Sequence, residues 1–227
     1  MKVVQIVLHD AVAILAALKP LSVIAPNLLL VFGSARWLTA LAGPLAEQFP
    51  AAIRLGCSTA GEISSQGVSD NTCVITAVHF EAVRLYAAST PLVVMQDSRA
   101  AGHALASQLP AAGLRALLVL GQGVNINGSA MIAGITDVLG AEVLISGGLA
   151  GDDAAFKQTF VLTDEGVFSD RLACVGFYGD GLQVSHGSFG GWEPFGPARK
   201  VTRCDHNVLF ELDGEPALDV YKRYLGD

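Results

Sequence analysis

The chain has 227 residues, of which 52% are hydrophobic and 15% are charged, and it carries a formal net charge of −7. A chain of this length can bury a large core, but its charged fraction lies well below the roughly 25% of an average soluble domain. We therefore expect part of its apolar surface to be covered by a larger chain, an oligomer or a bound partner. The 14 Lys and Arg residues are spread thinly, which excludes a basic surface that follows nucleic-acid phosphates.

The first residues, MKVVQIVLHD, lack the long apolar core and the cleavage site of an export signal. The next apolar stretch is interrupted by Lys19, Pro20, Pro26 and Asn27, so it falls short of the roughly 18 to 20 residues that span a bilayer. The four cysteines show no CxxC spacing. We therefore expect a cytoplasmic chain with reduced thiols, no membrane span and no zinc site of the usual kind.

The first half of the chain alternates strand and helix patterns. Asp10 is expected to cap a short helix over 11–18. Continuous apolar runs predict strands, and apolar residues at helical spacing predict a helix between them. Two further strands are separated by so few residues that a hairpin is the simplest interpretation. In chain order the ranges are a strand at 28–34, a helix at 36–50, a strand at 53–59, a hairpin of 73–80 with 83–89, and a helix with a linker at 97–113.

The second half follows the same order. Its ranges are a strand at 116–123, a helix at 127–140 with Asn127 near its start, a strand at 142–148, and antiparallel strands at 158–164, 172–180 and 182–188. The repeated order predicts a mixed α/β (α+β-like) fold of duplicated strand-helix-strand-hairpin units. Their sheets are largely antiparallel or mixed and are flanked by helices, and a layered α-β-β-α sandwich is one such arrangement. We predict one domain over 1–227 with an internal repeat at about 28–90 and 115–190.

A short motif recurs at the end of one strand in each half. GCSTAGEI at 56–63 aligns with SGGLAGDD at 146–153, which places Gly61 on Gly151 and Glu62 on Asp152. A glycine that allows a sharp turn is one explanation. Exposed backbone N–H groups and short polar side chains at strand ends are also typical of a rim that holds a small polar ligand. The predicted ligand-binding residues are Cys57, Ser58, Thr59, Gly61, Glu62, Gly148, Gly151, Asp152 and Trp192.

Catalytic motifs are not matched. The glycines around Cys57 are too far apart for a nucleophile elbow, and no histidine pattern accompanies that cysteine, so a small buried or half-buried thiol is the simpler interpretation. The glycine-rich run at 121–129 fits neither phosphate-binding fingerprint. The loop GGWEPFGP at 190–197 either covers a cavity with its aromatic side chains or is pinned onto the core by them. We therefore predict no catalytic residues and no enzymatic activity.

Four separated blocks resemble the FIST domain family in the family's own order. They are GCSTAGEI, ISGGLAGDD before FKQTFVLTDEG, GGWEPFGPARKVTR, and VLFELDGEPALDVYKRYLG, and together they run from about residue 28 to the end of the chain. In this family the ELDG segment stands at the junction between an N-terminal and a C-terminal FIST half. The resemblance implies the N-terminal half, with residues 207–227 as the start of the junction and the C-terminal half missing as a partner.

The resemblance also implies a function. FIST domains are sensory modules of bacterial signalling proteins, so it implies a non-enzymatic intracellular domain that binds a small ligand and relays it to a signalling protein such as a histidine kinase or a cyclic-di-nucleotide enzyme. One subgroup of the family binds haem and senses nitric oxide. A haem b cofactor here would need an axial histidine, for which His186, His206 and His79 are candidates. A further alternative is a protein-interaction scaffold without a ligand of its own.

Overall fold

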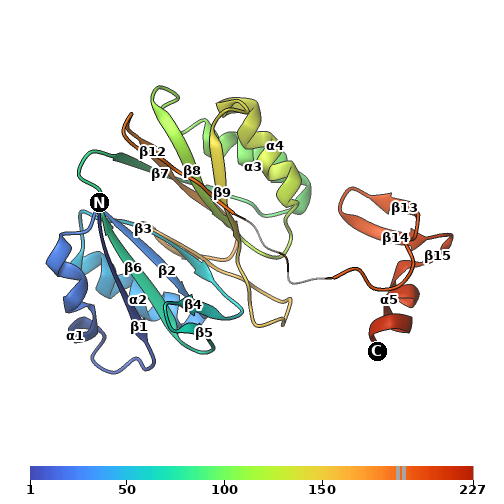
Figure 1. Cartoon of the computed structure of the whole chain (residues 1–227), viewed down its shortest axis with the longest axis horizontal. Coiled ribbons are helices and arrows are strands. Elements are labelled where there is room, and N and C mark those ends of the chain that lie inside the picture. Colours follow the sequence, from blue (N-terminus) through green and yellow to red (C-terminus); the bar gives the residue numbers. More distant parts are fainter. Residues whose placement is uncertain (188–189, 191–192, 227) are drawn as a thin grey trace. The chain divides into compact units, whose positions relative to one another are not determined.

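The computed structural model describes residues 1–187, 190 and 193–226 (Figure 1). The chain divides into two compact units, Met1–Ser185 and His186–Asp227. No helix in the described part of the chain is both long enough and apolar enough to cross a bilayer.

The first unit contains two main sheets and one small hairpin. The first sheet has the strand order β1 (Lys2–Leu8), β6 (Cys73–His79), β2 (Leu28–Gly33), β3 (Ile53–Ser58), β10 (Val161–Thr163) and β11 (Gly166–Phe168). The second sheet has the order β7 (Arg84–Pro91), β12 (Arg171–Tyr178), β8 (Leu114–Gly121) and β9 (Leu144–Leu149). The hairpin of β4 (Glu62–Ser64) and β5 (Gly67–Ser69) follows β3 directly.

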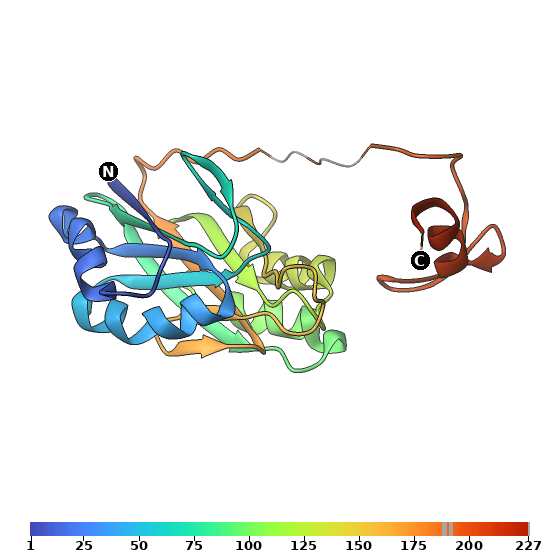
Figure 2. The ribbon, with the colours of Figure 1, turned by 90° about the horizontal axis from the view of Figure 1, so that it is seen from below.

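Helices cover the outer face of each sheet, and the inner faces pack on one another. The helices of the first sheet are α1 (Ile14–Leu18), η1 (Lys19–Ile24) and α2 (Ala35–Gln48), and those of the second are η2 (Met95–Asp97), α3 (Ser98–Ala106) and α4 (Gly128–Leu139). One apolar cluster joins each helix layer to its sheet, and a third lies between the sheets. Figures 1 and 2 show these layers from two directions. The structure therefore confirms a mixed α/β fold, here layered as an α-β-β-α sandwich.

Local sequence explains why the central elements form. Strand side chains alternate between faces, so Leu29 and Val31 of β2 join the cluster beneath the helices while Leu30 and Phe32 face the other sheet. Helix α2 buries Trp37, Leu38, Leu41 and Leu45, which lie on one side of a helix. The side chain of Asn127 accepts a hydrogen bond from Ala130 N–H at 3.0 Å and caps α4, as its position before that helix predicts.

Both sheets are built from the same sequence of elements. In chain order, each copy has three strands with a helix after the first and after the second, and then a fourth strand. In the sheet, this fourth strand lies between the first and the second and runs antiparallel to both. The second and third strands pair in parallel in both copies. In the first sheet these strands are β1, β2, β3 and β6, and in the second they are β7, β8, β9 and β12.

The predicted hairpin of 73–80 with 83–89 is wrong. Strand β6 lies between β1 and β2 and bonds to both, so it has no free edge for another partner. The chain instead crosses from the first sheet to the second after β6, where β7 pairs with β12. The predicted strand at 182–188 is also not formed, because its described residues, 182–187, are irregular.

A pair of glycines fixes the register of the repeat. A Cβ atom on Gly56 would lie 2.2 Å from the carbonyl oxygen of Val31, and one on Gly147 would lie 1.8 Å from that of Val119. The two glycines therefore occupy equivalent places, each too close to its neighbouring strand for a side chain. In this structural register Gly151 corresponds to Ala60. The alignment of the two motifs by sequence instead matches Gly151 with Gly61, so it is shifted by one residue. Glu62 and Asp152 are accordingly not structural equivalents.

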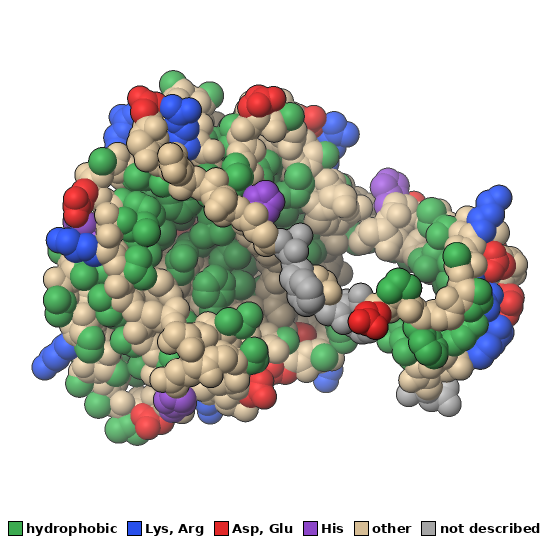
Figure 3. All heavy atoms as spheres, viewed as in Figure 1, with side chains coloured by type: hydrophobic (Ala, Val, Ile, Leu, Met, Phe, Trp, Pro, Cys, Tyr) green, Lys and Arg blue, Asp and Glu red, His purple; other side chains and the backbone are tan. Residues whose placement is uncertain are grey.

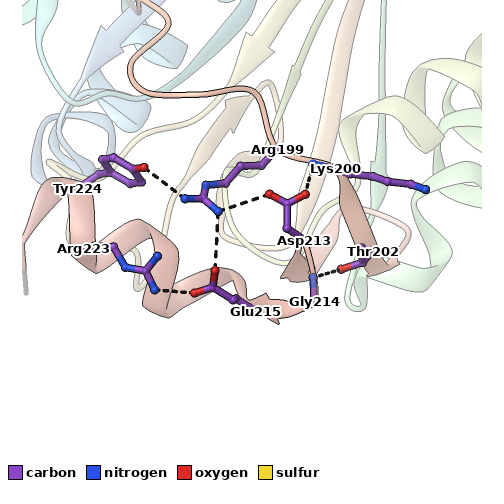
Figure 4. A network of polar contacts seen from close by, with 8 residues as sticks. All are labelled: Arg199, Lys200, Thr202, Asp213, Gly214, Glu215, Arg223 and Tyr224. Atoms are coloured by element: carbon purple, nitrogen blue, oxygen red, sulfur yellow. Dashed lines mark hydrogen bonds and ion pairs between the residues drawn. The ribbon is translucent and has the colours of Figure 1, made fainter.

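The second unit is a small sheet with one helix. Its elements are β13 (Val201–Asp205), β14 (Val208–Leu212), β15 (Glu215–Pro216) and α5 (Ala217–Leu225). Asp213 and Gly214 connect β14 to β15 with φ angles of 53° and 81°, as a tight two-residue hairpin turn requires. The Arg199 guanidinium contacts Asp213, Glu215 and the Tyr224 hydroxyl, and Arg223 binds Glu215 (Figure 4). The ELDG segment (residues 211–214) thus supplies the turn and one of these carboxylates, Asp213, and Glu215 follows it directly.

Candidate functional site

A cavity opens between the two sheets, where β3 and β9 end. Its volume is about 540 Å³. The lining residues are Phe32, Cys57, Ser58, Thr59, Ala60, Gly61, Leu118, Leu120, Ser146, Gly147, Gly148, Leu149 and Gly151. In Figure 3 hydrophobic side chains gather in a hollow between the two sheets. The two copies of the motif therefore meet at one place. Six of the predicted rim residues line this cavity: Cys57, Ser58, Thr59, Gly61, Gly148 and Gly151.

A second hollow of about 300 Å³ continues the first along β8 and β9. The two hollows share Leu118 and Ser146. The remaining lining of the second is Met1, Phe80, Ala116, Leu117, Leu144, Phe177, Leu182, Gln183 and Val184. Together they form a groove between the sheets, and Leu182 to Val184 of the irregular segment after β12 form part of its wall. The described residues that line the groove include no Lys, Arg, Asp or Glu.

Strand alternation explains the empty space. Ile145 of β9 packs toward the helices, so Leu144, Ser146 and Gly148 point to the opposite side, into the groove. Ser146 and Gly148 are too small to fill the space between the sheets. A Cβ atom on Gly148 would meet no atom within 4 Å, which confirms open space at that position.

Ser58 and Thr59 supply the polar end of the cavity. Ser58 is buried, and its hydroxyl oxygen accepts a hydrogen bond from Phe160 N–H at 2.8 Å, which leaves its own proton available to another acceptor. Thr59 is half-buried and donates its hydroxyl proton to Glu62 Oε1 at 2.6 Å, so its oxygen can accept from a ligand. The end of β3 therefore carries one hydroxyl that can donate and one whose oxygen can accept.

Glu62 lies behind Thr59 and not in the cavity. It is 3% exposed, and its Oε2 atom accepts from Thr72 N–H at 3.1 Å and from the Thr72 hydroxyl at 2.9 Å. With the bond from Thr59, the carboxylate holds three donors that belong to two separate segments. The physical role of Glu62 is to fasten the corner after β3 to the start of β6.

The two motif glycines serve the corner geometry. Gly151 donates its N–H to the Ser58 carbonyl at 2.7 Å, and a Cβ atom on it would lie 2.9 Å from Ala60 N. This close approach brings the two corners together. Gly61 has a φ of 130°, which L side chains rarely adopt.

Asp152 turns away from the cavity to organise its own loop. Its carboxylate accepts hydrogen bonds from the N–H groups of Phe156, Lys157 and Gln158 at 2.7 to 3.1 Å. The hydrogen bond from Lys157 N–H is the main reason why the pKa of Asp152 lies below its usual value of 3.8. Trp192, the remaining predicted rim residue, lies outside the described residues.

The cysteines are arranged as core residues. Burial raises the pKa of the Cys57 thiol, which lines the cavity, to about 12, and burial likewise raises that of Cys174 to about 12. Burial and then the charge of Glu62 raise the pKa of Cys73. A thiol that stays protonated at neutral pH is a poor nucleophile.

The predicted haem ligands are divided between the two units. His79 bonds through Nδ1 to the Ala25 carbonyl at 2.7 Å, and His206 sits in the β13–β14 turn beside Asp205. His79 is not among the groove's described lining residues, and His186 and His206 both belong to the second unit. Within the described ranges no group of three His, Cys, Asp or Glu side chains could hold a metal ion. The described lining of the groove thus contains no histidine that could bind haem iron axially.

A smaller cavity of about 170 Å³ lies between the sheets at another place, beside β10 and β12. Its most buried charge, Arg54, forms an ion pair with Asp164 at 3.2 Å and donates to two backbone carbonyl groups. Its charged groups are thus satisfied by the fold itself.

Sequence reasoning missed the apolar part of the groove. In the sequence its apolar lining residues look like ordinary strand residues: Phe32, Leu118, Leu120 and Leu149. Ser146 looks like a residue beside a glycine turn. The usable signal is the match of LLVFG at 29–33 with LLVLG at 117–121, which predicts that Phe32 and Leu120 occupy equivalent places in two packed copies.

Comparison with known proteins gives three findings. The model of the FIST N domain family matches residues 27–215. An uncharacterized protein of Methanocaldococcus jannaschii is 39% identical over 94 residues, which cover 40% of this chain and only 17% of that protein's length. A crystal structure of cyanuric acid hydrolase from A. caulinodans aligns with 79% of this chain and 67% of its own length, at a TM-score of 0.42 and 12% identity.

Proposed function

The chain belongs to the FIST N domain family, and on this premise we propose that it is a non-enzymatic sensory domain that binds its ligand in the groove between the two sheets. FIST domains are generally small-ligand sensory domains of signalling proteins. The observation that supports this site is the convergence of both repeat corners on one cavity of about 540 Å³. Ligand sites in proteins are typically concave and mostly apolar, with a few polar groups that orient the ligand.

The groove also offers a route for relaying the signal. A ligand bound there contacts Phe32 and Cys57 of the first sheet and Leu118 and Leu120 of the second. A ligand shifts a conformational equilibrium only by its difference in affinity for the two states. A ligand that bridges the two sheets favours the conformation in which both sheets contact the ligand. We propose that a cytoplasmic signalling protein, such as a histidine kinase or a cyclic-di-nucleotide enzyme, reads this arrangement.

Gly148→Trp tests the site because a large side chain fills the groove at a position with open space. Gly43→Trp is the matched control, because a Cβ there also meets no atom within 4 Å and the residue lies on the exposed side of α2. Native mass spectrometry of the purified proteins, before and after incubation with metabolite extract, measures the bound mass. We expect the wild type and Gly43→Trp to carry the same small molecule and Gly148→Trp to carry none. Equal occupancy of all three would refute this site.

A second candidate function, the interaction scaffold, is favoured by the helix of the second unit. Leu218, Tyr221 and Leu225 of α5 are 58% to 63% exposed and lie at i, i+3 and i+7, on one helix face. Binding of a purified histidine kinase that is lost in Leu218→Glu but unchanged in Gly148→Trp would support this function. Binding that depends on groove occupancy would instead support the sensory one.

A further inference from the structure

We propose that the groove binds an elongated, uncharged amphipathic molecule, with an unbranched hydrocarbon body along β8 and β9 and a hydroxyl or amide head group at Ser58 and Thr59. This inference rests on the proposed function and names the chemical class of its ligand. Three features of the groove carry it: its length, its lack of charged side chains and the hydrogen-bonding character of its polar end.

The first feature is length. The lining of the two hollows extends along β9 from Leu144 to Leu149, with Ile145 turned to the other face, and Ser146 belongs to both hollows. At about 3.3 Å per residue, this stretch of strand is roughly 16 Å long. A compact metabolite occupies only one of the two hollows. An extended chain occupies both and covers the apolar side chains of each.

The second feature is polarity. The far hollow is lined by Phe80, Leu117, Leu144, Phe177 and Leu182 among others, and it offers Ser146 and Gln183 as its polar side chains. Cys57 in the near hollow is a protonated, uncharged thiol because burial raises its pKa to about 12. Burying a charge without a partner is far more costly than burying an alkyl chain. The walls therefore favour a hydrocarbon body.

The third feature is the head-group end. Ser58 can donate a hydrogen bond and Thr59 can accept one, since Thr59 gives its own proton to Glu62. A hydroxyl or an amide matches this pair because each both donates and accepts. A carboxylate cannot donate, and it would face the charge of Glu62 behind Thr59, with no cationic side chain in the described lining. The end of the groove therefore selects against anionic head groups.

The first experiment is a chain-length series measured by isothermal titration calorimetry on the whole chain. The probes are 1-hexanol, 1-octanol, 1-decanol and, as charged counterpart, decanoate at pH 8. Each added methylene group that enters the groove should tighten binding about fourfold. We expect 1-decanol to bind at one site per chain, and decanoate to bind more weakly by on the order of tenfold or more. Equal affinity of hexanol and decanol, or tighter binding of decanoate, would overturn the proposal.

Ser146→Phe provides a test that is independent of overall stability, because Ser146 lines the junction of the two hollows. A phenyl group there should separate them, so that affinity stops rising with chain length at hexanol. Ser146→Ala is the matched control and should keep the full dependence on length. An unchanged length dependence in Ser146→Phe would show that the chain does not lie along β9.

The failure of this inference can be told apart from the failure of the proposed function. If no alcohol binds but a compact metabolite binds the wild type and Gly43→Trp and not Gly148→Trp, then the ligand class is wrong and the site is right. If alcohols and metabolites bind equally well to Gly148→Trp, or nothing binds to any variant, both proposals are wrong.

Discussion

The sharpest structural prediction concerns the buried carboxylate of Glu62. Replacing Glu62 with Ala removes the acceptor of three hydrogen bonds, from the Thr59 hydroxyl, the Thr72 hydroxyl and the Thr72 N–H group. The hydroxyl groups can turn toward other acceptors, and that of Thr72 already lies 2.8 Å from the Ser69 hydroxyl. The Thr72 N–H group is fixed by the backbone and stays buried without an acceptor.

The magnitude follows from these contacts. Hydrogen bonds to charged groups contribute about 1.5 to 3 kcal/mol each, and an unpaired buried donor costs about 1 to 3 kcal/mol. Because two of the three donors can adapt, we expect Glu62→Ala to lower the free energy of unfolding by about 3 to 5 kcal/mol. Glu62→Gln keeps an oxygen for Thr72 and presents an amide donor that Thr59 can accept. It should therefore cost only about 1 kcal/mol, the loss of the charge.

Urea unfolding at 25 °C, followed by the fluorescence of Trp37, measures both values. Trp37 is fully buried in the first unit and its indole donates to the Asn71 carbonyl, so it reports on that unit. A Trp192→Phe background removes the other tryptophan, and Glu142→Ala, at an exposed position, is the control. A Glu62→Ala value within about 0.5 kcal/mol of the control would refute the reasoning, because surface substitutions commonly fall in that range.

Three further predictions concern a closely packed glycine, two buried thiols and a loop carboxylate. Gly56→Ala should destabilise the first unit by about 1 to 3 kcal/mol, since its Cβ would lie 2.2 Å from the Val31 carbonyl oxygen, and urea unfolding with an unaffected Gly148→Ala variant checks this. The Cys57 and Cys174 thiols have a pKa of about 12 in the folded chain against 9.0 unfolded, so the stability they give is complete below pH 9 and is lost between pH 9 and about 12. At pH 10 the loss is about 1.4 kcal/mol per thiol, so replacing both with Ala should make the pH profile measured by urea unfolding shallower by twice that amount, while the buried Cys73 thiol keeps its own share. Asp152→Asn should speed hydrogen exchange at residues 156–158 in mass spectrometry, and unchanged exchange there would contradict the loop's dependence on this carboxylate.

The parts of the fold that could be predicted from the sequence are those with a local cause. The strand at 28–34 and the helix at 36–50 carry their own apolar periodicity, and Asn127 caps its helix within three residues. The pairing of strands has no such local cause. A short gap after residue 80 favours a hairpin locally, yet β6 already has β1 and β2 on its two edges. That outcome depends on the N-terminal strand, which is far away in sequence.

The candidate site also has a part that could be predicted from local sequence and a part that could not. Small residues at the ends of two strands predict a shared corner, and the structure places Ser58, Thr59, Gly148 and Gly151 around one cavity. The acidic residue after each corner could not be assigned from the motif, because its role depends on which N–H groups the fold brings near. Glu62 accepts from Thr72, ten residues later and just before β6, whereas Asp152 accepts from its own loop.

Gly148 and Ser146 connect the structure of the groove to its use. Small residues at these two places leave apolar walls exposed to water, which costs stability in the empty protein. A ligand that covers those walls restores this stability, and it does so by contacting both sheets at once. A ligand that binds only the folded state adds RT ln(1 + [L]/Kd) to the free energy of unfolding, about 2.7 kcal/mol at a hundredfold excess over Kd. Because that free energy is gained across the interface of the two sheets, occupancy of the groove should limit their separation before it changes either sheet alone.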